Sequence, residues 1–248
     1  MPGGQFDSSK TRVSPVFDEL AKRSDNWVLQ LLELTSFGVD KNLDLKFLKG
    51  YWGTKELGLH PPVSLLSWLI RHPKHLKQNA LSSPERELLL NGNPEKVEEA
   101  LTLLRTENRD RAWYIFEGRT YPDAVIETPD ALIVIEGKRT EAGPTTSTKW
   151  LEGRHQIWRH IDAAWEQRGK RRVFGLFIVE SDGECGDVPQ HWKQAIKNSL
   201  VPSTLATSFP HRSNTECEEI RQCLLGVTTW QAVCREFSLP AGTLLAHV

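Results

Sequence analysis

Two apolar segments separated by Pro129 and Asp130 constrain the fold of this 248-residue chain more than any other feature. The segments are residues 121–128, YPDAVIET, and residues 131–138, ALIVIEGK. Their β-branched and aliphatic side chains, bounded by turn residues, are typical of strands. Because only two residues separate the segments, we expect the strands to pair as an antiparallel hairpin.

Segments on either side of the hairpin predict the rest of a core that mixes helices and strands. Asn93 suits the cap of a helix, and Pro94 suits its first position. The expected elements are a helix at residues 94–107, a strand at residues 111–119, the hairpin, a long helix at residues 148–168 and a strand at residues 171–181. The last strand is apolar enough to be buried on both faces. The predicted order is therefore helix, three strands, helix, strand.

The predicted architecture is α/β, with a core at residues 93–182 between two helical regions. The N-terminal region, residues 1–92, is expected to be helical because apolar residues recur in it at helical spacing. The C-terminal region, residues 183–248, is expected to be mostly helical. The helices expected there are near residues 189–200 and 215–237.

Composition and charge are those of an ordinary globular protein. Apolar residues make up 39% of the chain and charged residues 25%. No apolar run approaches the roughly 18–20 residues that span a bilayer, and the first residues lack the apolar core of a signal peptide. We therefore expect a cytoplasmic protein with no membrane partner. The net charge of −1 does not indicate a nucleic-acid binder, although local patches decide such binding.

Acidic side chains are expected to meet at the open end of the hairpin. Side chains alternate between the faces of a strand, so Glu136 and Lys138 share one face. With residues 129–130 as the turn, counting outward places Asp123 opposite Glu136, with their Cβ atoms about 4.5–5.5 Å apart. Two carboxylates that close repel each other unless a cation lies between them. The pairing depends on the turn, since Pro-Asp is not a preferred two-residue turn and a bulge would shift the register.

A divalent metal with oxygen ligands, Mg²⁺ or Mn²⁺, meets the need for a cation. Asp123 and Glu136 would bind it, and the backbone carbonyl of Gly137 is a further candidate ligand because glycine lets the backbone approach closely. A bound metal would polarise a phosphodiester and lower the pKa of a water. Lys138 would orient that water or stabilise the negative charge of the transition state.

The pair Pro122-Asp123 followed by Glu136-Gly137-Lys138 resembles the motif of the PD-(D/E)xK nuclease superfamily. The predicted order of elements over about residues 94–180 also resembles the core of that superfamily. The resemblance implies a restriction-endonuclease-like core, an αβββαβ mixed sheet flanked by helices. It further implies hydrolysis of DNA, less often of RNA.

Further positions of the superfamily have counterparts in this chain. Many members carry an acidic residue on the helix before the first strand, and Glu98 or Glu99 is the candidate here. RecB-type members carry a glutamine and a tyrosine four residues apart on the helix after the ExK strand. Gln156 and His160 have that spacing, with histidine in place of the tyrosine. Gln156 is therefore expected to touch the active site.

Basic and aromatic residues near the expected 148–168 helix are candidates for nucleic-acid contacts. Arg154 and Arg159 are candidates to reach phosphates, or else are solvated, and Gln156 is a third candidate for contact with nucleic acid. The tryptophans at positions 150, 158 and 165 either stack on bases or belong to the core. Glu117 is either a metal ligand or a partner of a nearby basic residue such as Arg119.

Three functions are compatible with these patterns. The first is a metal-dependent nuclease that cuts DNA in repair, restriction or phage defence, with a homodimer as one way to cut both strands. The second is a non-catalytic nucleic-acid-binding or assembly module that retains the nuclease fold. The third is a ribonuclease on the same fold. The presence of Asp123, Glu136 and Lys138 together favours the first.

Overall fold

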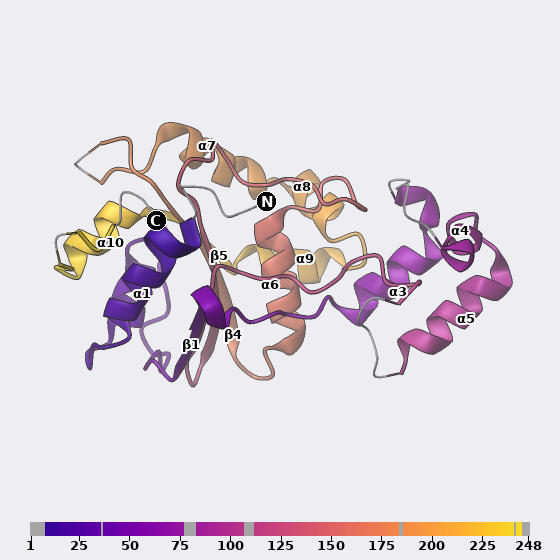
Figure 1. Cartoon of the computed structure of the whole chain (residues 1–248), viewed down its shortest axis with the longest axis horizontal. Coiled ribbons are helices and arrows are strands. Elements are labelled where there is room, and N and C mark those ends of the chain that lie inside the picture. Colours follow the sequence, from indigo (N-terminus) through magenta and orange to yellow (C-terminus); the bar gives the residue numbers. More distant parts are fainter. Residues whose placement is uncertain are drawn as a thin grey trace.

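A five-stranded mixed sheet with helices on both faces forms the centre of the molecule (Figure 1). The computed structural model describes residues 8–35, 37–76, 83–106, 112–183, 186–240 and 242–244. The strands lie in the order β1 (Lys49–Trp52), β2 (Ala124–Glu127), β3 (Ala131–Gly137), β4 (Arg172–Val179) and β5 (Leu224–Thr229). The expected α/β class is therefore confirmed.

The hairpin of β2 and β3 has the predicted register. Ala124 pairs with Ile135, and the amide of Thr128 donates to the carbonyl of Ala131 over 2.9 Å. The turn is braced from outside, since the Asp130 carboxylate accepts the amide of Asp44 over 2.8 Å. These contacts explain how a Pro-Asp pair, which is not a preferred hairpin turn, closes the hairpin without a bulge.

Parallel strands extend the sheet beyond the hairpin. β3 pairs in parallel with β4, and helix α6 (Gln156–Gln167) connects them. Such parallel pairs require a long crossover, which the helix provides. β5 then pairs in parallel with β4, with a register shift between Gly175 and Leu176. The sheet is thus antiparallel on the β1 side and parallel on the β5 side.

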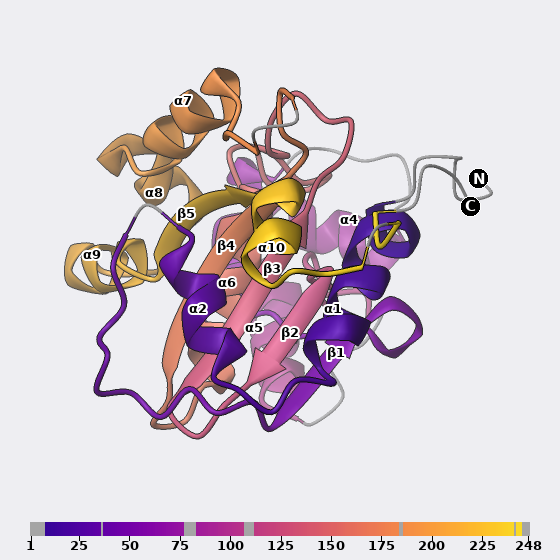
Figure 2. The ribbon, with the colours of Figure 1, turned by 90° about the vertical axis from the view of Figure 1, so that its left-hand side faces the viewer.

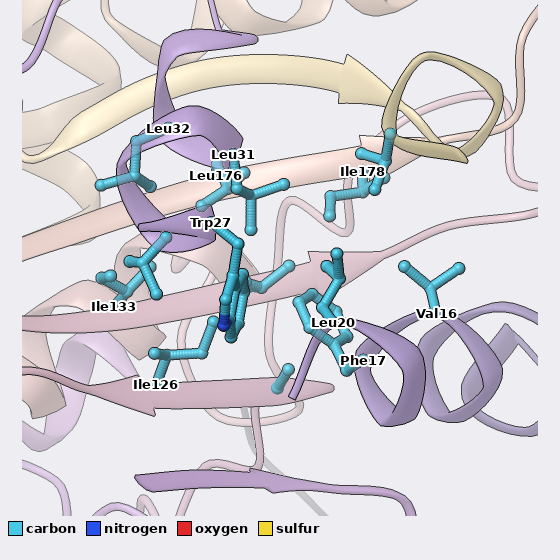
Figure 3. Packing of buried hydrophobic residues seen from close by; sticks show 14 of the residues in the cluster. Val16, Phe17, Leu20, Trp27, Leu31, Leu32, Ile126, Ile133, Leu176 and Ile178 are labelled. Atoms are coloured by element: carbon cyan, nitrogen blue, oxygen red, sulfur yellow. The ribbon is translucent and has the colours of Figure 1, made fainter. Parts of the chain in front are cut away.

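Helices from both ends of the chain cover one face of the sheet. These are the π-helical segment η1 (Ser9–Val13), α1 (Ser14–Leu20), α2 (Trp27–Glu33) and α10 (Trp230–Glu236), and Figure 2 shows α1, α2 and α10 in front of the strands. Phe17 and Trp27 pack on the strand residues Ile126 and Ile133 in one continuous apolar cluster (Figure 3). Burial of these side chains fixes the hairpin against the helical layer.

The opposite face is covered by α6 together with helices that follow β4. These are α7 (Gln190–Ser199), α8 (Pro202–Ser208) and α9 (Asn214–Arg221). Ile157, Trp158 and Ile161 of α6 pack with strand residues in a second apolar cluster. The alternation of β3 places Val134 in this cluster and Ile133 in the first. Both faces of the hairpin are therefore buried.

A separate helical group is inserted between β1 and β2. It contains α3 (Val63–Arg71), α4 (Pro84–Leu90) and α5 (Pro94–Leu104), with the short 3₁₀ segment η3 (Pro73–His75), while a second such segment, η2 (Gly53–Lys55), follows β1. These helices have their own apolar cluster. Figure 1 shows them together at one end of the molecule, beyond α6. Asn93 caps α5 by accepting the amide of Lys96, as predicted.

The strand predicted at residues 111–119 is wrong. Residues 112–119 are irregular, and the neighbouring Thr120 forms an isolated bridge with Leu59. Their apolar side chains, including Tyr114 and Phe116, pack into the helical insertion instead of a sheet. The third antiparallel strand is β1, which lies in the region predicted to be helical. Burial against α3 and α5 thus overrides the local strand propensity of this segment.

Two predicted helices also have different limits. The helix expected at residues 148–168 begins at Gln156, because Gly153 has a φ of +72° and breaks the helical path before it. The helix expected at 215–237 is interrupted by β5, whose six residues are all buried. Two of the five strands, β1 and β5, therefore come from outside the predicted core at residues 93–182. In the part of the chain that the structure describes, no helix is long and apolar enough to cross a membrane.

Candidate functional site

The three residues predicted to form the site meet at the open end of the hairpin. The amide of Gly137 donates to Asp123 Oδ2 over 2.8 Å, across the two strands. Lys138 Nζ lies 2.7 Å from Glu136 Oε1. The register of the hairpin places Asp123 opposite Glu136, one residue before the first pair of β2. Two carboxylates and an ammonium group therefore lie together on one face of the sheet, at the carboxyl end of its central strand β3.

Glu136 is held as a charged carboxylate in a buried position. Its side chain is 2% exposed, and it contacts both Lys138 and His160. Burial alone would raise the pKa of Glu136, but the hydrogen bond and charge of His160 and the charge of Lys138 together lower that pKa below its ordinary value. Burial lowers the pKa of Lys138, and the Glu136 carboxylate outweighs this so that the pKa is raised. Both groups are therefore ionised at neutral pH.

The pKa of Asp123 is shifted in the opposite direction from that of Glu136. Burial and then the negative charge of Glu136 raise the pKa of Asp123 to about 8, against the opposing effects of the Gly137 amide and Lys138. The carboxylate of Glu56, on the segment after β1, also raises this pKa. Asp123 therefore retains a proton near neutral pH unless a further positive charge is brought to it.

The glycine between Glu136 and Lys138 is required by packing on the other face of the sheet. A Cβ atom at position 137 would lie 2.8 Å from Trp230 and 2.8 Å from Val13. Trp230 also donates from Nε1 to the carbonyl of Lys138 over 3.1 Å. The side chains of η1 and α10 thus pack directly against the strand at this point, and they fix the backbone that carries both charged side chains.

His160 contacts Glu136, and the sequence indicated this residue only through its spacing of four residues from Gln156. Its Nε2 lies 2.9 Å from Glu136 Oε2, and its Nδ1 lies 2.7 Å from the hydroxyl of Thr120. A carboxylate only accepts hydrogen bonds, so Nε2 is the donor to Glu136. Thr120 was not predicted, because its place beside α6 depends on the irregular segment before it. Gln156 Oε1 lies 3.5 Å from Lys138 Nζ, so Gln156 lies beside the candidate site.

The expectation that Arg154 reaches phosphates is wrong. Its side chain is fully buried and contacts Glu117 at 3.0 Å and Asp162 at 2.8 Å. It also donates to the carbonyl of Ser208 over 2.7 Å. Glu117 is accordingly a structural partner of Arg154 and also lies 3.5 Å from Arg159. The pattern of charges in the sequence does not reveal these contacts, because Glu117 and Ser208 lie far from Arg154 in the chain.

Other predicted contacts have mixed outcomes. Arg159 donates to the carbonyls of Gly118 and Arg119 and keeps a partly exposed side chain, so it remains a candidate for nucleic-acid contact. Trp158 is fully buried and donates to the carbonyl of Ser199, so it does not stack on bases. Its role is in the core.

Glu98 and Glu99 are not brought to the hairpin. Both are exposed on α5, and Glu99 pairs with Lys96 at 2.6 Å. Figure 1 shows α5 in the helical insertion, at the end of the molecule away from the sheet. The expected acidic residue lies on the helix before the first strand of the sheet. That strand is β1, whereas α5 follows β1 and precedes β2, so α5 is not this helix. Besides Glu136, the acidic residue whose charge acts on Asp123 is Glu56, which follows β1.

The donor set at the hairpin fits a hard divalent cation. Among the described residues, no group of three or more His, Cys, Asp or Glu side chains is arranged to hold a metal ion. The site offers two carboxylates, from Asp123 and Glu136, with the carbonyl of Gly137 as a candidate third ligand. Mg²⁺ is commonly held by one or two carboxylates and completes its shell with water and substrate oxygens. A cation brought to Asp123 would favour the ionised form of its carboxyl, whose pKa burial and Glu136 raise to about 8.

This arrangement can therefore hold a cation and present an ammonium group beside it, in a partly buried setting where electrostatic interactions are strong. No family model, curated protein or solved structure matches the chain, so the function has to be argued from the geometry of this site.

Proposed function

We propose that this protein is a metal-dependent nuclease of the PD-(D/E)xK type, with DNA as its expected substrate. The observation that carries the proposal is the meeting of Asp123, Glu136 and Lys138 at one end of β2 and β3. A buried Glu–Lys pair beside a carboxyl group that retains its proton is costly for folding. Such a cost is expected where the residues serve chemistry.

The order of the elements supports the same proposal. Helix α2, strands β1, β2 and β3, helix α6 and strand β4 follow one another as helix, strand, strand, strand, helix, strand. The α3–α5 group is an insertion between the first two strands. This is the order expected of a restriction-endonuclease-like core, with different residues in the first helix and first strand from those predicted.

The side chains of the site have distinct tasks in this proposal. Asp123 and Glu136, with the Gly137 carbonyl, would hold Mg²⁺ or Mn²⁺, which when bound polarises the phosphodiester and activates a water. Lys138 leaves its contact with Glu136 when substrate binds and donates to the attacking water or to a phosphate oxygen. Gln156 holds the ammonium of Lys138 in place from α6. His160 holds the carboxylate of Glu136 in one orientation.

Cleavage assays with matched variants test this proposal. Plasmid, linear and single-stranded DNA and RNA are incubated with Mg²⁺, Mn²⁺ or EDTA. We expect cleavage that requires the metal and falls at least about 100-fold in Asp123→Ala and in Lys138→Ala. The control variants are Asp187→Ala and Lys193→Ala, since both side chains are exposed and lie outside the site. If the two site variants cut as well as the wild type, the site is wrong.

One observation favours the non-catalytic alternative. Both oxygens of Glu136 already have partners, Lys138 on one and His160 on the other. In this state Lys138 occupies the oxygen of Glu136 that a metal would need. A module that binds nucleic acid without cutting it could retain such an arrangement. The cleavage assay separates the alternatives: binding with no cleavage of any substrate under any metal condition favours the module, and cleavage of RNA alone indicates the ribonuclease.

A further inference from the structure

A cavity of about 520 Å³ opens beside the candidate site. Its volume lies within the range of about 300–1,000 Å³ that is typical of sites for small ligands. The residues that matter for its chemistry are Arg119, Thr120, Tyr121, Lys149, Trp150 and Arg159. They come from the irregular segment before β2, from the loop before α6 and from α6 itself.

Two aromatic side chains in the wall are fixed in place. The rings of Phe116 and Trp150 are 5.7 Å apart in an edge-on arrangement, and the guanidinium of Arg86 lies 5.3 Å from the Trp150 ring. Arg86 is itself held, since it donates to the carbonyls of residues 112, 113 and 115. The Trp150 ring is therefore a rigid surface and not a mobile side chain.

A third ring, that of Tyr121, stands at the cavity with 54% of its surface exposed. A Cβ atom at Gly58 would lie 2.7 Å from this ring, so the ring rests against the bare backbone of Gly58. A large aromatic side chain that is exposed but supported in this way is suited to stacking on a flat ligand.

The charge of the lining is positive. Arg154 lies between the carboxylates of Glu117 and Asp162, and Arg159 Nε lies 3.5 Å from Glu117 Oε1. The lining carries more basic than acidic side chains, since its one carboxylate is that of Glu117 and its basic residues are Arg119, Lys149, Arg154 and Arg159. Cations interleaved with aromatic rings are the combination with which proteins bind single-stranded nucleic acid, because the cations follow the phosphates while each base stacks on a ring.

The cavity is connected to the candidate catalytic residues by direct contacts. Gln156 and His160 line it, and they contact Lys138 at 3.5 Å and Glu136 at 2.9 Å. Thr120, also in the lining, contacts His160 on its other side. A ligand in the cavity thus lies one side chain away from Glu136 and Lys138.

We infer that this cavity receives one unpaired nucleotide of the substrate strand, next to the phosphodiester that is cut. The inference rests on the proposed nuclease function and specifies its substrate as a strand that is single-stranded at this position. A base within a duplex is stacked on its neighbours, and it presents no free face to Tyr121 or Trp150. The protein therefore prefers single strands, flaps or frayed ends over intact duplex.

Binding in EDTA tests the inference separately from cleavage. The probes are a fluorescein-labelled oligothymidylate of about 15 nucleotides and a blunt hairpin duplex with the same label, and the readout is fluorescence anisotropy. We expect the wild type to bind the single strand more tightly than the duplex. Tyr121→Ala should weaken binding of the single strand at least about fivefold, because stacking on one base is lost, and should leave the duplex unaffected. Tyr121→Phe should bind like the wild type.

Matched controls separate stacking and charge from unspecific effects. Phe37 is also an exposed aromatic residue but lies elsewhere, so Phe37→Ala should change neither affinity. Lys149→Ala should weaken binding of the single strand and reduce its salt dependence by about one counterion. Lys193→Ala removes an exposed lysine of α7 and should change neither the affinity for the single strand nor its salt dependence.

The outcomes for the cavity and for the nuclease are distinguishable. If Tyr121→Ala and Lys149→Ala bind the oligothymidylate as the wild type does, the cavity does not receive the strand, even if metal-dependent cleavage is intact. If the variants lose binding while no substrate is cut, the cavity is a nucleotide site and the nuclease proposal fails. Binding of free thymidine monophosphate that depends on Tyr121, without such dependence for the oligonucleotide, overturns the assignment to a substrate strand.

Discussion

The imidazole Nε2 of His160 lies 2.9 Å from the carboxylate Oε2 of Glu136, and both side chains are buried. α6 thereby holds the carboxylate that β3 presents, since the remaining nitrogen of the same ring is tied to Thr120. A carboxylate fixed in this way loses little freedom when it binds a cation, so His160 would be a positioning residue for the proposed metal site.

Replacement of His160 should weaken metal binding without removing the metal ligands. We expect His160→Ala to reduce the affinity for Mn²⁺ by about 10- to 100-fold, which is the usual effect of losing a partner of a metal ligand. His160→Gln, which can still donate to Glu136, should recover part of the affinity. Titration calorimetry with Mn²⁺ measures this.

The control for His160 is His75→Ala, which removes an exposed histidine of η3. It should bind Mn²⁺ as the wild type does. Equal affinities for His160→Ala and the wild type would show that the Glu136 carboxylate needs no support from α6.

Replacement of Asp123 by asparagine should stabilise the metal-free protein at pH 8. The pKa of Asp123 is raised to about 8 in the folded protein and is about 3.9 in an unfolded chain. Between these values the folded state binds more protons, so this group makes the wild type less stable as pH rises from about 4 to about 8. Asparagine is neutral throughout and can still accept the Gly137 amide. We expect a gain of at least about 1 kcal/mol at pH 8.

Urea unfolding in EDTA at several pH values measures the difference between Asp123→Asn and the wild type. The difference should be small near pH 4 and should grow towards pH 8, while Asp187→Asn should behave as the wild type at every pH. A difference that does not depend on pH contradicts the buried, protonated state of Asp123. The same variant should lose metal-dependent cleavage, because the carboxylate that would hold the cation is gone.

The hairpin could be predicted because its determinants are local. Strand propensity, the two-residue separation and the alternation of faces specify the pairing of Asp123 with Glu136. The glycine at position 137 is equally visible in the sequence, but the reason for it is not. Trp230 lies more than 90 positions further along the chain, and its contact with the strand depends on how the two helical layers pack.

The first strand and the charged core could not be predicted for the same reason. Residues 49–52 are four residues whose strand state depends on pairing with β2, across an insertion of three helices. The segment at 112–119 has the composition of a strand, but its side chains are buried by that insertion. Arg154 resembles a solvated residue in sequence, and two of its partners, Glu117 and Ser208, lie 37 and 54 residues away in the chain. Tertiary burial decides each of these cases.

Replacement of Gly137 by alanine should destabilise the fold through the face opposite the site. The added Cβ would lie 2.8 Å from both Trp230 and Val13, so the helical layer must shift. Overpacking of this kind costs about 1–3 kcal/mol. Urea unfolding measures the loss, and Gly143→Ala is the matched control because nothing lies within 4 Å of a Cβ atom there. Equal stability of the two variants would mean that η1 and α10 do not pack tightly on the strand.

Replacement of Arg154 should affect stability and not nucleic-acid affinity. Arg154→Met leaves the carboxylates of Glu117 and Asp162 buried without their main counter-charge, which typically costs about 3–5 kcal/mol. Arg105→Met, at an exposed arginine, should change stability by less than about 0.5 kcal/mol.

The pH dependence of unfolding gives an independent check on Arg154. Burial raises the pKa of Asp162, but Arg154, with His211 and Arg212, lowers it well below its ordinary value. A carboxylate with a lowered pKa in the folded state contributes stability above its unfolded pKa of about 3.9, and this contribution is lost as pH falls through that value towards the folded pKa. Arg154→Met should therefore reduce the loss of stability that the wild type shows on acidification below about pH 4. If the variant keeps the acid sensitivity of the wild type, the other two partners suffice to hold Asp162 charged.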